Sequence, residues 1–185
     1  TIDTQENTAI TLAEEIKKFL KEHSKSEPKI MLVGLGNRNI TADSLGPKVA
    51  DKIVVTRHVK KIQNKKNNEN LEIDNRLGNI CAIAPGVMGM TGIETSEIIK
   101  GMISTVSPDL LIVIDALASR KATRVNSTIQ ISDTGIVPGS GVGNHRMELS
   151  REVLGIPVIS VGVPTVVDAL TLVKDTLDIA EKDIP

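Results

Sequence analysis

Aromatic residues are almost absent from this sequence. Its 185 residues include no tryptophan, no tyrosine and a single phenylalanine, Phe19. Aliphatic residues and methionine must therefore form the core, and hydrophobic residues are abundant enough for this, at 40% of the chain. Stacking of nucleic-acid bases on aromatic side chains is excluded as a binding mode. A net charge of −1 also gives no general attraction to nucleic acid or to a membrane surface, so we expect neither as a direct partner.

Cysteine is equally scarce. Cys81 is the single cysteine, which excludes an internal disulfide framework and a zinc site built from several cysteines. It lies in the apolar run NICAIA, so we interpret it as a small buried residue, with a reactive thiol as the alternative. The sequence also lacks an apolar run long enough to cross a membrane and any pattern of a secretory signal peptide. We therefore expect a cytoplasmic protein.

Short apolar runs alternate with segments of helical periodicity. The runs typical of strands lie at 29–34, 79–85, 110–115, 127–132 and 156–164. Helical spacing of apolar residues predicts helices at 8–22, at 45–54, from about 94 to 106, and from about 166 onward. This alternation predicts an α/β protein, a three-layer sandwich with a mostly parallel central sheet of the phosphorylase/hydrolase type. We expect one domain over 1–185, with an N-terminal helical segment at 1–28 and an exposed polar excursion at 60–79.

The segment Val33–Pro47, VGLGNRNITADSLGP, places two glycines and an acid between a predicted strand and a predicted helix. A dinucleotide-binding loop needs the pattern G-x-G-x-x-G. Gly34 and Gly36 fit that pattern, but Asn39 occupies the third position. The acid expected after the second strand is absent too, because NICAIAP ends in alanine and proline. Phosphate binding is therefore the weaker interpretation of this loop.

Asp43 and Asp115 are the candidate catalytic acids. Asp43 follows the first predicted strand at the mouth of its loop, and Asp115 ends the strand that begins with five apolar residues. The carboxyl ends of parallel strands share one edge of a sheet, so we expect both acids there. Two carboxylates a few ångströms apart do not both ionise readily, so the pair supplies an acid and a base for attack of water on an amide. The alternatives are a helix N-cap for Asp43 and a hydrogen bond to loop amides for Asp115.

Three further polar residues are candidates for supporting roles near these loops. Asn37 and Asn144 each follow a glycine, and they are either turn residues with positive φ or amide donors to an oxyanion. Glu94 begins a predicted helix beside a glycine-rich loop. It either stabilises the N-terminus of that helix or contributes to the site.

One more acid and two arginines complete the candidate set. Asp133 begins the glycine-rich segment 133–146, as a third acid of the site or as an Asx-turn residue. Arg120 and Arg124 follow the predicted strand that contains Asp115. They either anchor Asp115 or an acidic substrate, or they form ordinary surface ion pairs.

Six segments carry a resemblance to a known family. They are GLGNRNITADSLGP, VTRH, APGVMGMTGIETSEII, PDLLIVIDALASR, RVNSTIQISDTGIVPGSGVGN and LGIPVISVGVPTVVDA. Over about residues 29–170 the sequence resembles the germination protease (spore protease) family of endospore-forming bacteria. The resemblance implies an atypical aspartic endopeptidase of the spore core that degrades small acid-soluble spore proteins. It also implies a zymogen, a homotetramer, no cofactor, and catalytic aspartates in the motifs TADSLGP and IDALASR, at Asp43 and Asp115.

The fold of that family is similar to the fold of hydrogenase maturation endopeptidases, which suggests an alternative. Those enzymes carry a Gly-x-Gly-Asn loop followed by an acid, and a second acid at a strand end. Together with a later histidine, these acids bind nickel. Asp43 and Asp115 match the two acids, and His145 would be the third ligand. A metal-dependent endopeptidase of this type is therefore one alternative, and a non-catalytic member of the fold is another.

Overall fold

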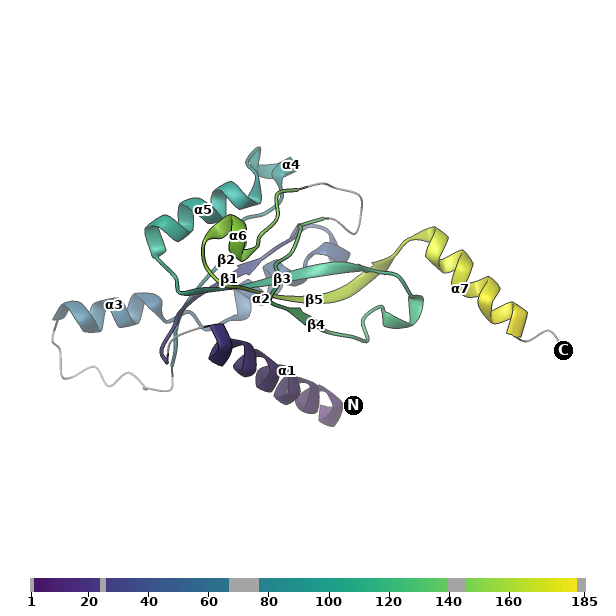
Figure 1. Ribbon diagram of the computed structural model, residues 1–185, viewed down its shortest axis with the longest axis horizontal. Helices are drawn as coiled ribbons and strands as arrows, with labels where there is room; N and C mark the ends of the chain where they lie inside the picture. Colours follow the sequence, from purple (N-terminus) through teal and green to yellow (C-terminus); the bar gives the residue numbers. More distant parts are fainter. Residues whose placement is uncertain (1, 24–25, 67–76, 140–145, 183–185) are drawn as a thin grey trace.

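A five-stranded sheet forms the centre of the molecule (Figure 1). The computed structural model describes residues 2–23, 26–66, 77–139 and 146–182. In spatial order the strands are β2 (Asn79–Ile83), β1 (Lys29–Gly34), β3 (Leu110–Ser119), β5 (Val158–Val167) and β4 (Gln130–Ser132). The first four strands run parallel, and β4 is antiparallel to β5 at the edge. The sequence therefore predicts a mostly parallel sheet correctly.

Helices cover both faces of the sheet. The described helices are α1 (Ile2–His23), α2 (Leu45–Lys52), α3 (Arg57–Lys66), α4 (Met88–Thr91), α5 (Thr95–Val106), α6 (Arg151–Leu154) and α7 (Ala169–Lys182), with 3-10 turns η1 (Thr41–Asp43) and η2 (Ala122–Arg124). Side chains alternate between the faces of a strand. Leu111 and Val113 of β3 therefore face α5 and α6, whereas Ile112 and Ile114 face α1 and α2. The expected three-layer sandwich is confirmed.

Two strands are longer than their sequence predicts. The run at 110–115 was expected to end at Asp115, but β3 continues to Ser119 because it stays paired with β5 as far as Val167. β1 ends opposite Ile114, so the last part of β3 and β5 forms a two-stranded ribbon beyond the rest of the sheet. Figure 1 shows this ribbon leading to α7, which lies away from the other helices.

The segment expected as a polar excursion begins with a helix. α3 covers the start of the predicted 60–79 excursion, and residues 67–76 lie outside the described part of the chain. Thr56, just before α3, ties this region to β2, since its backbone N–H donates to the carbonyl of Ile80 at 2.9 Å. Among the described residues, no helix is both long enough and apolar enough to span a membrane.

Candidate active site

Glycines bring the loop after β1 close to the neighbouring elements. Gly34 and Gly46 lie in backbone contact, which lets the first turn of α2 pack directly on the end of β1. Gly36 has a φ of +112°, and a Cβ there would collide with the backbone carbonyl of Asp43. The loop therefore has a steric reason for glycine at these positions, and at Gly36 the missing side chain makes room for Asp43.

Asp43 is the last residue of η1, and its carboxylate faces back into the loop. Its Oδ2 accepts a hydrogen bond from the backbone N–H of Asn37 at 2.7 Å. Ser44, not Asp43, occupies the N-cap of α2, so the N-cap alternative for Asp43 is wrong. The side-chain oxygen of Asn37 accepts the backbone N–H of Asn39 at 2.9 Å, as in an Asx-turn. Asn37 is a turn residue as one alternative proposed, but the positive φ belongs to Gly36.

Asp115 lies inside β3, opposite Gly162 of β5, and the residue is almost fully buried at 6% exposure. Its Oδ1 accepts the backbone N–H of Ala116 at 2.9 Å. The pKa of Asp115 is raised to about 7, chiefly by burial; the hydrogen bond from the Ala116 N–H lowers it, and the nearby charge of Asp43 adds the smallest effect, which raises it. At neutral pH a substantial fraction of this carboxyl is therefore protonated.

The two acids meet at the carboxyl edge of the sheet. Asp43 reaches this edge through η1, which contacts both β3 and β5. Each acid has one oxygen held by a backbone N–H. The other oxygen, Oδ1 of Asp43 and Oδ2 of Asp115, has no hydrogen-bond partner among the residues described. One oxygen of each carboxyl group is therefore not held by the described part of the protein.

Gly162 is a part of this edge that the sequence analysis missed. A Cβ at Gly162 would lie 2.5 Å from the Cδ1 atom of Leu117. The missing side chain therefore lets Leu117 lie across the position opposite Asp115. A glycine inside a strand is the signal that could have indicated such a close approach.

Asp133 is not part of this edge. β4 runs antiparallel, with Ser132 opposite Ser160, so the chain leaves β4 at the amino end of β5. There Asp133 accepts a hydrogen bond from Nε2 of His23 at 3.1 Å and lines a hollow with Pro157 and Val158. The alternative of a third acid beside Asp43 is therefore wrong, because the antiparallel direction of β4 carries Asp133 to the opposite edge of the sheet.

Arg120 is also displaced from the acids. β3 continues for four residues beyond Asp115, which places Arg120 about 16 Å further along the chain at the usual rise of an extended strand. That separation is longer than the two side chains can bridge, so Arg120 does not anchor Asp115. Arg124 lies further on still, in η2.

Glu94 acts in the local structure at the start of α5. It is the N-cap residue of this helix, and its backbone N–H donates to Oε2 of Glu97 at 3.1 Å. Its own Oε1 accepts a hydrogen bond from Arg146 at 3.2 Å, and both side chains are about three-quarters buried. The stabilising role at the helix N-terminus therefore accounts for Glu94.

Asn144 and His145 lie outside the described residues, so their predicted roles gain no structural account. In the part of the chain that is described, His, Cys, Asp and Glu side chains form no group of three or more that could hold a metal ion.

Burial raises the pKa of the Cys81 thiol, which fits a small residue in a packed strand.

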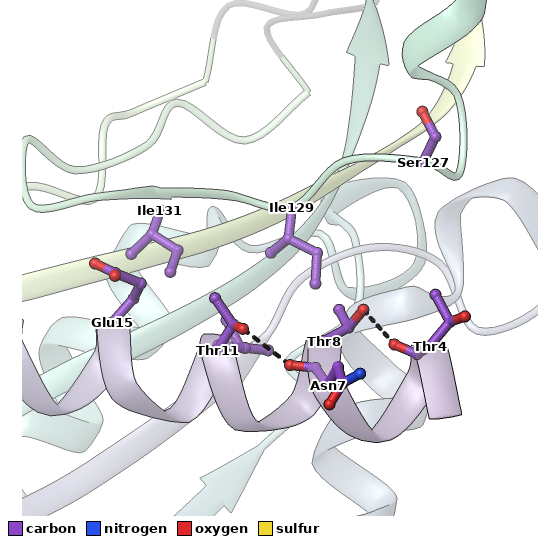
Figure 2. A pocket seen from close by; sticks show the side chains of 9 residues that line it. Thr4, Asn7, Thr8, Thr11, Glu15, Ser127, Ile129 and Ile131 are labelled. Atoms are coloured by element: carbon purple, nitrogen blue, oxygen red, sulfur yellow. Dashed lines mark hydrogen bonds between the residues drawn. The ribbon is translucent and has the colours of Figure 1, made fainter. Parts of the chain in front are cut away.

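A hollow of about 450 Å³ lies between α1 and β4, on the other side of the sheet from Asp115. Figure 2 shows Ile129 and Ile131 pointing from the β4 segment toward the threonines of α1. Ile131 packs with the cluster around Ile112, whereas Asp115 shares its face of β3 with Leu111 and Val113. This hollow is therefore separate from the acid pair.

Comparison with known proteins identifies the family. A profile of the germination proteases matches residues 1–184. The chain is 55% identical over 175 residues to the germination protease of Clostridium acetobutylicum, covering 94% of this chain and 52% of that protein. It is 53% identical over 177 residues to the germination protease of Bacillus subtilis, covering 95% of this chain and 46% of that protein.

Among solved structures, the NiFe hydrogenase maturation protease HycI of Thermococcus kodakarensis is similar to this chain. It superposes with a TM-score of 0.43 at 20% sequence identity, over 88% of this chain and 97% of the other. The chain spans about half the length of the curated germination proteases that it matches. Because the family profile extends over nearly all of its residues, the chain belongs to the germination protease family.

Proposed function

We propose that this chain acts as a single endopeptidase domain in which Asp43 and Asp115 together activate water. The observation that carries the proposal is the burial of Asp115 beside Asp43, which raises the pKa of Asp115 to about 7. Two carboxyl groups in unequal surroundings can hold different protonation states at one pH, which is the requirement for acid–base catalysis by a pair.

The unequal surroundings assign a role to each acid. Asp115 is the protonated member, and it donates a hydrogen bond to the oxygen of the scissile carbonyl. Asp43 is the ionised member, and it takes a proton from the attacking water. The oxygens available for this are Oδ2 of Asp115 and Oδ1 of Asp43, since a backbone N–H holds the other oxygen of each group. Asp43 then passes the proton taken from water to the leaving nitrogen as the C–N bond breaks, which leaves Asp43 ionised and Asp115 protonated for the next cycle.

Membership in the family supports a proposal for the substrate and the setting. We propose that the substrates are small acid-soluble spore proteins, cleaved in the spore core during germination without a cofactor. Zymogen control and assembly into a homotetramer belong to the same proposal. Exposed apolar side chains on α7 support self-association, because contact with a second copy would remove their apolar surface from water. They are Leu170, Leu172, Val173, Leu177 and Ile179.

The direct test is cleavage of a purified small acid-soluble spore protein, followed by mass spectrometry of the fragments. We expect discrete internal cuts rather than trimming from the ends. The same incubation with a chelator separates the proposal from a metal enzyme, because two carboxylates alone make a poor nickel or zinc site. Loss of cleavage on chelation, with recovery on adding one metal, would favour the hydrogenase-maturation alternative. A folded protein that cuts nothing would favour a non-catalytic role.

A further inference from the structure

Thr165 lies at an irregularity of the sheet close to the acid pair. β3 and β5 pair residue for residue up to Leu117 opposite Pro164, and the next pair is Ala118 opposite Val166. Thr165 is therefore an extra residue on β5 with no partner on β3, which is a β-bulge. Bulges redirect a side chain away from the regular alternation and are frequent next to active sites.

The redirected side chain reaches the turn that carries Asp43. The hydroxyl of Thr165 donates a hydrogen bond to the backbone carbonyl of Ala42 at 2.6 Å. Ala42 is the middle residue of η1 and directly precedes Asp43. This contact joins positions 123 residues apart in the chain, and the Thr165 side chain is only partly accessible to solvent.

The hydrogen bonds within η1 are all local to the turn, so they do not fix its place on the sheet. Asp43 N–H donates to the carbonyl of Ile40 at 2.9 Å, and Ser44 donates to the carbonyl of Thr41 through its N–H at 3.4 Å and its hydroxyl at 2.9 Å. The Asn37 N–H holds only the carboxylate end of Asp43. The hydrogen bond from Thr165 fixes the backbone end, and it does so from the same strand pair that contains Asp115.

We propose that Thr165 is a positioning residue that sets the separation of the two carboxyl groups by tethering η1 to β5. The inference rests on the proposed pairing of Asp43 with Asp115. It gives β5 a role in the site, although neither Asp43 nor Asp115 lies on that strand. A displacement of about 1 Å in a catalytic group can lower a rate by about 100-fold, so the tether matters for catalysis more than for folding.

The test compares Thr165→Val, which keeps the shape but removes the hydroxyl, with Thr165→Ser, which keeps the hydroxyl. We expect Thr165→Val to lower kcat by about 10- to 100-fold with little change in KM, and Thr165→Ser to retain most of the activity. Thr56→Val is the matched control. Thr56 also bonds a distant carbonyl, that of Gly78, but on the far side of β2. Its loss should lower the melting temperature without lowering kcat.

A second measurement separates this inference from the proposed function. Titration of the Asp115 carboxyl by NMR should show a lower pKa in Thr165→Val, because Asp43 moves away, and no further lowering when Asp43 is already Asn. This result in a protein that cleaves nothing would support the tether and refute the function. Wild-type kcat with an unchanged Asp115 titration in Thr165→Val would overturn the inference, as would an equal loss in Thr165→Ser.

Discussion

The two ends of the parallel strands hold acids in opposite settings. At the carboxyl end, Asp115 is 6% exposed and lies near the charge of Asp43. At the amino end, Asp133 leaves 44% of its side chain exposed and bonds the ring of His23. Water and the imidazole surround the Asp133 charge, whereas burial makes ionisation of Asp115 costly. Adjacency to a strand shows where an acid lies, but exclusion of water decides what chemistry it can perform.

Removal of either acid at the carboxyl end is the strongest test of this difference. Asp43→Asn and Asp115→Asn should each lower kcat/KM by about 1,000-fold or more, because each removes one half of the acid–base pair. The double variant should be little worse than either single one, since the two groups act together. Circular dichroism of each variant checks that the fold is intact. Near-normal cleavage by a single variant would remove that residue from the mechanism.

Stability should depend on pH through Asp115. Its pKa is about 7 in the folded chain, whereas an ordinary aspartate has a pKa of 3.8, so the unfolded chain loses this proton first as pH rises. The contribution of Asp115 therefore lowers the free energy of unfolding between about pH 4 and pH 7, by about 4 kcal/mol in total. Urea unfolding of wild type and Asp115→Asn at several pH values measures it. If both proteins show the same pH dependence, Asp115 is not the buried acid described here.

Activity should also report the protonation of Asp115. Above a pH of about 7 the carboxyl ionises and can no longer donate to the scissile carbonyl, so kcat/KM should fall about tenfold per pH unit. A second fall in rate at lower pH should make the profile bell-shaped, and its two apparent pKa values belong to the pair of acids rather than to either residue. A rate that stays constant from pH 7 to pH 9 would contradict the assignment of Asp115 as the acid.

Gly36 offers a steric test of the same edge. Gly36→Ala should cost about 1–3 kcal/mol in unfolding free energy and reduce kcat, because its Cβ meets the carbonyl of Asp43 at a φ of +112°. Gly92→Ala is the control, since Gly92 also has positive φ, +70°, but no atom lies within 4 Å of an added Cβ. It should lose some stability and no activity. Equal losses of activity in both variants would show that the contact with Asp43 is unimportant.

The smallest effect on cleavage and stability is expected from Asp133, at the amino end of the parallel strands. Asp133→Asn should leave kcat/KM unchanged and alter the free energy of unfolding by about 1 kcal/mol at most, because a half-exposed pair contributes little. Denaturant unfolding and the cleavage assay measure both quantities. A marked loss of cleavage would return Asp133 to the active site and remove the contrast between the two ends of the sheet.

Local patterns in the sequence were sufficient for the apolar strands and for two candidate site residues, although they missed α3. The continuous apolar runs predict buried parallel strands, because a strand covered on both faces has no polar side. The glycines around Asp43 indicate a tight loop, and Gly36 has the positive φ that such a loop requires. Asp115 follows five apolar residues, which places it at the edge of the buried layer. These properties depend on a few neighbouring residues, so the sequence by itself determined them.

Tertiary structure decided which residues meet. β4 is antiparallel, which carries Asp133 to the far edge, and β3 extends past Asp115, which carries Arg120 away. The bulge at Thr165 and the burial of Asp115 also arise from pairing between strands far apart in sequence. Strand direction, strand length and the exclusion of water are set by partner strands and covering helices. A local sequence pattern does not determine these three properties, because the hydrogen bonds and contacts that set them form only when the sheet assembles.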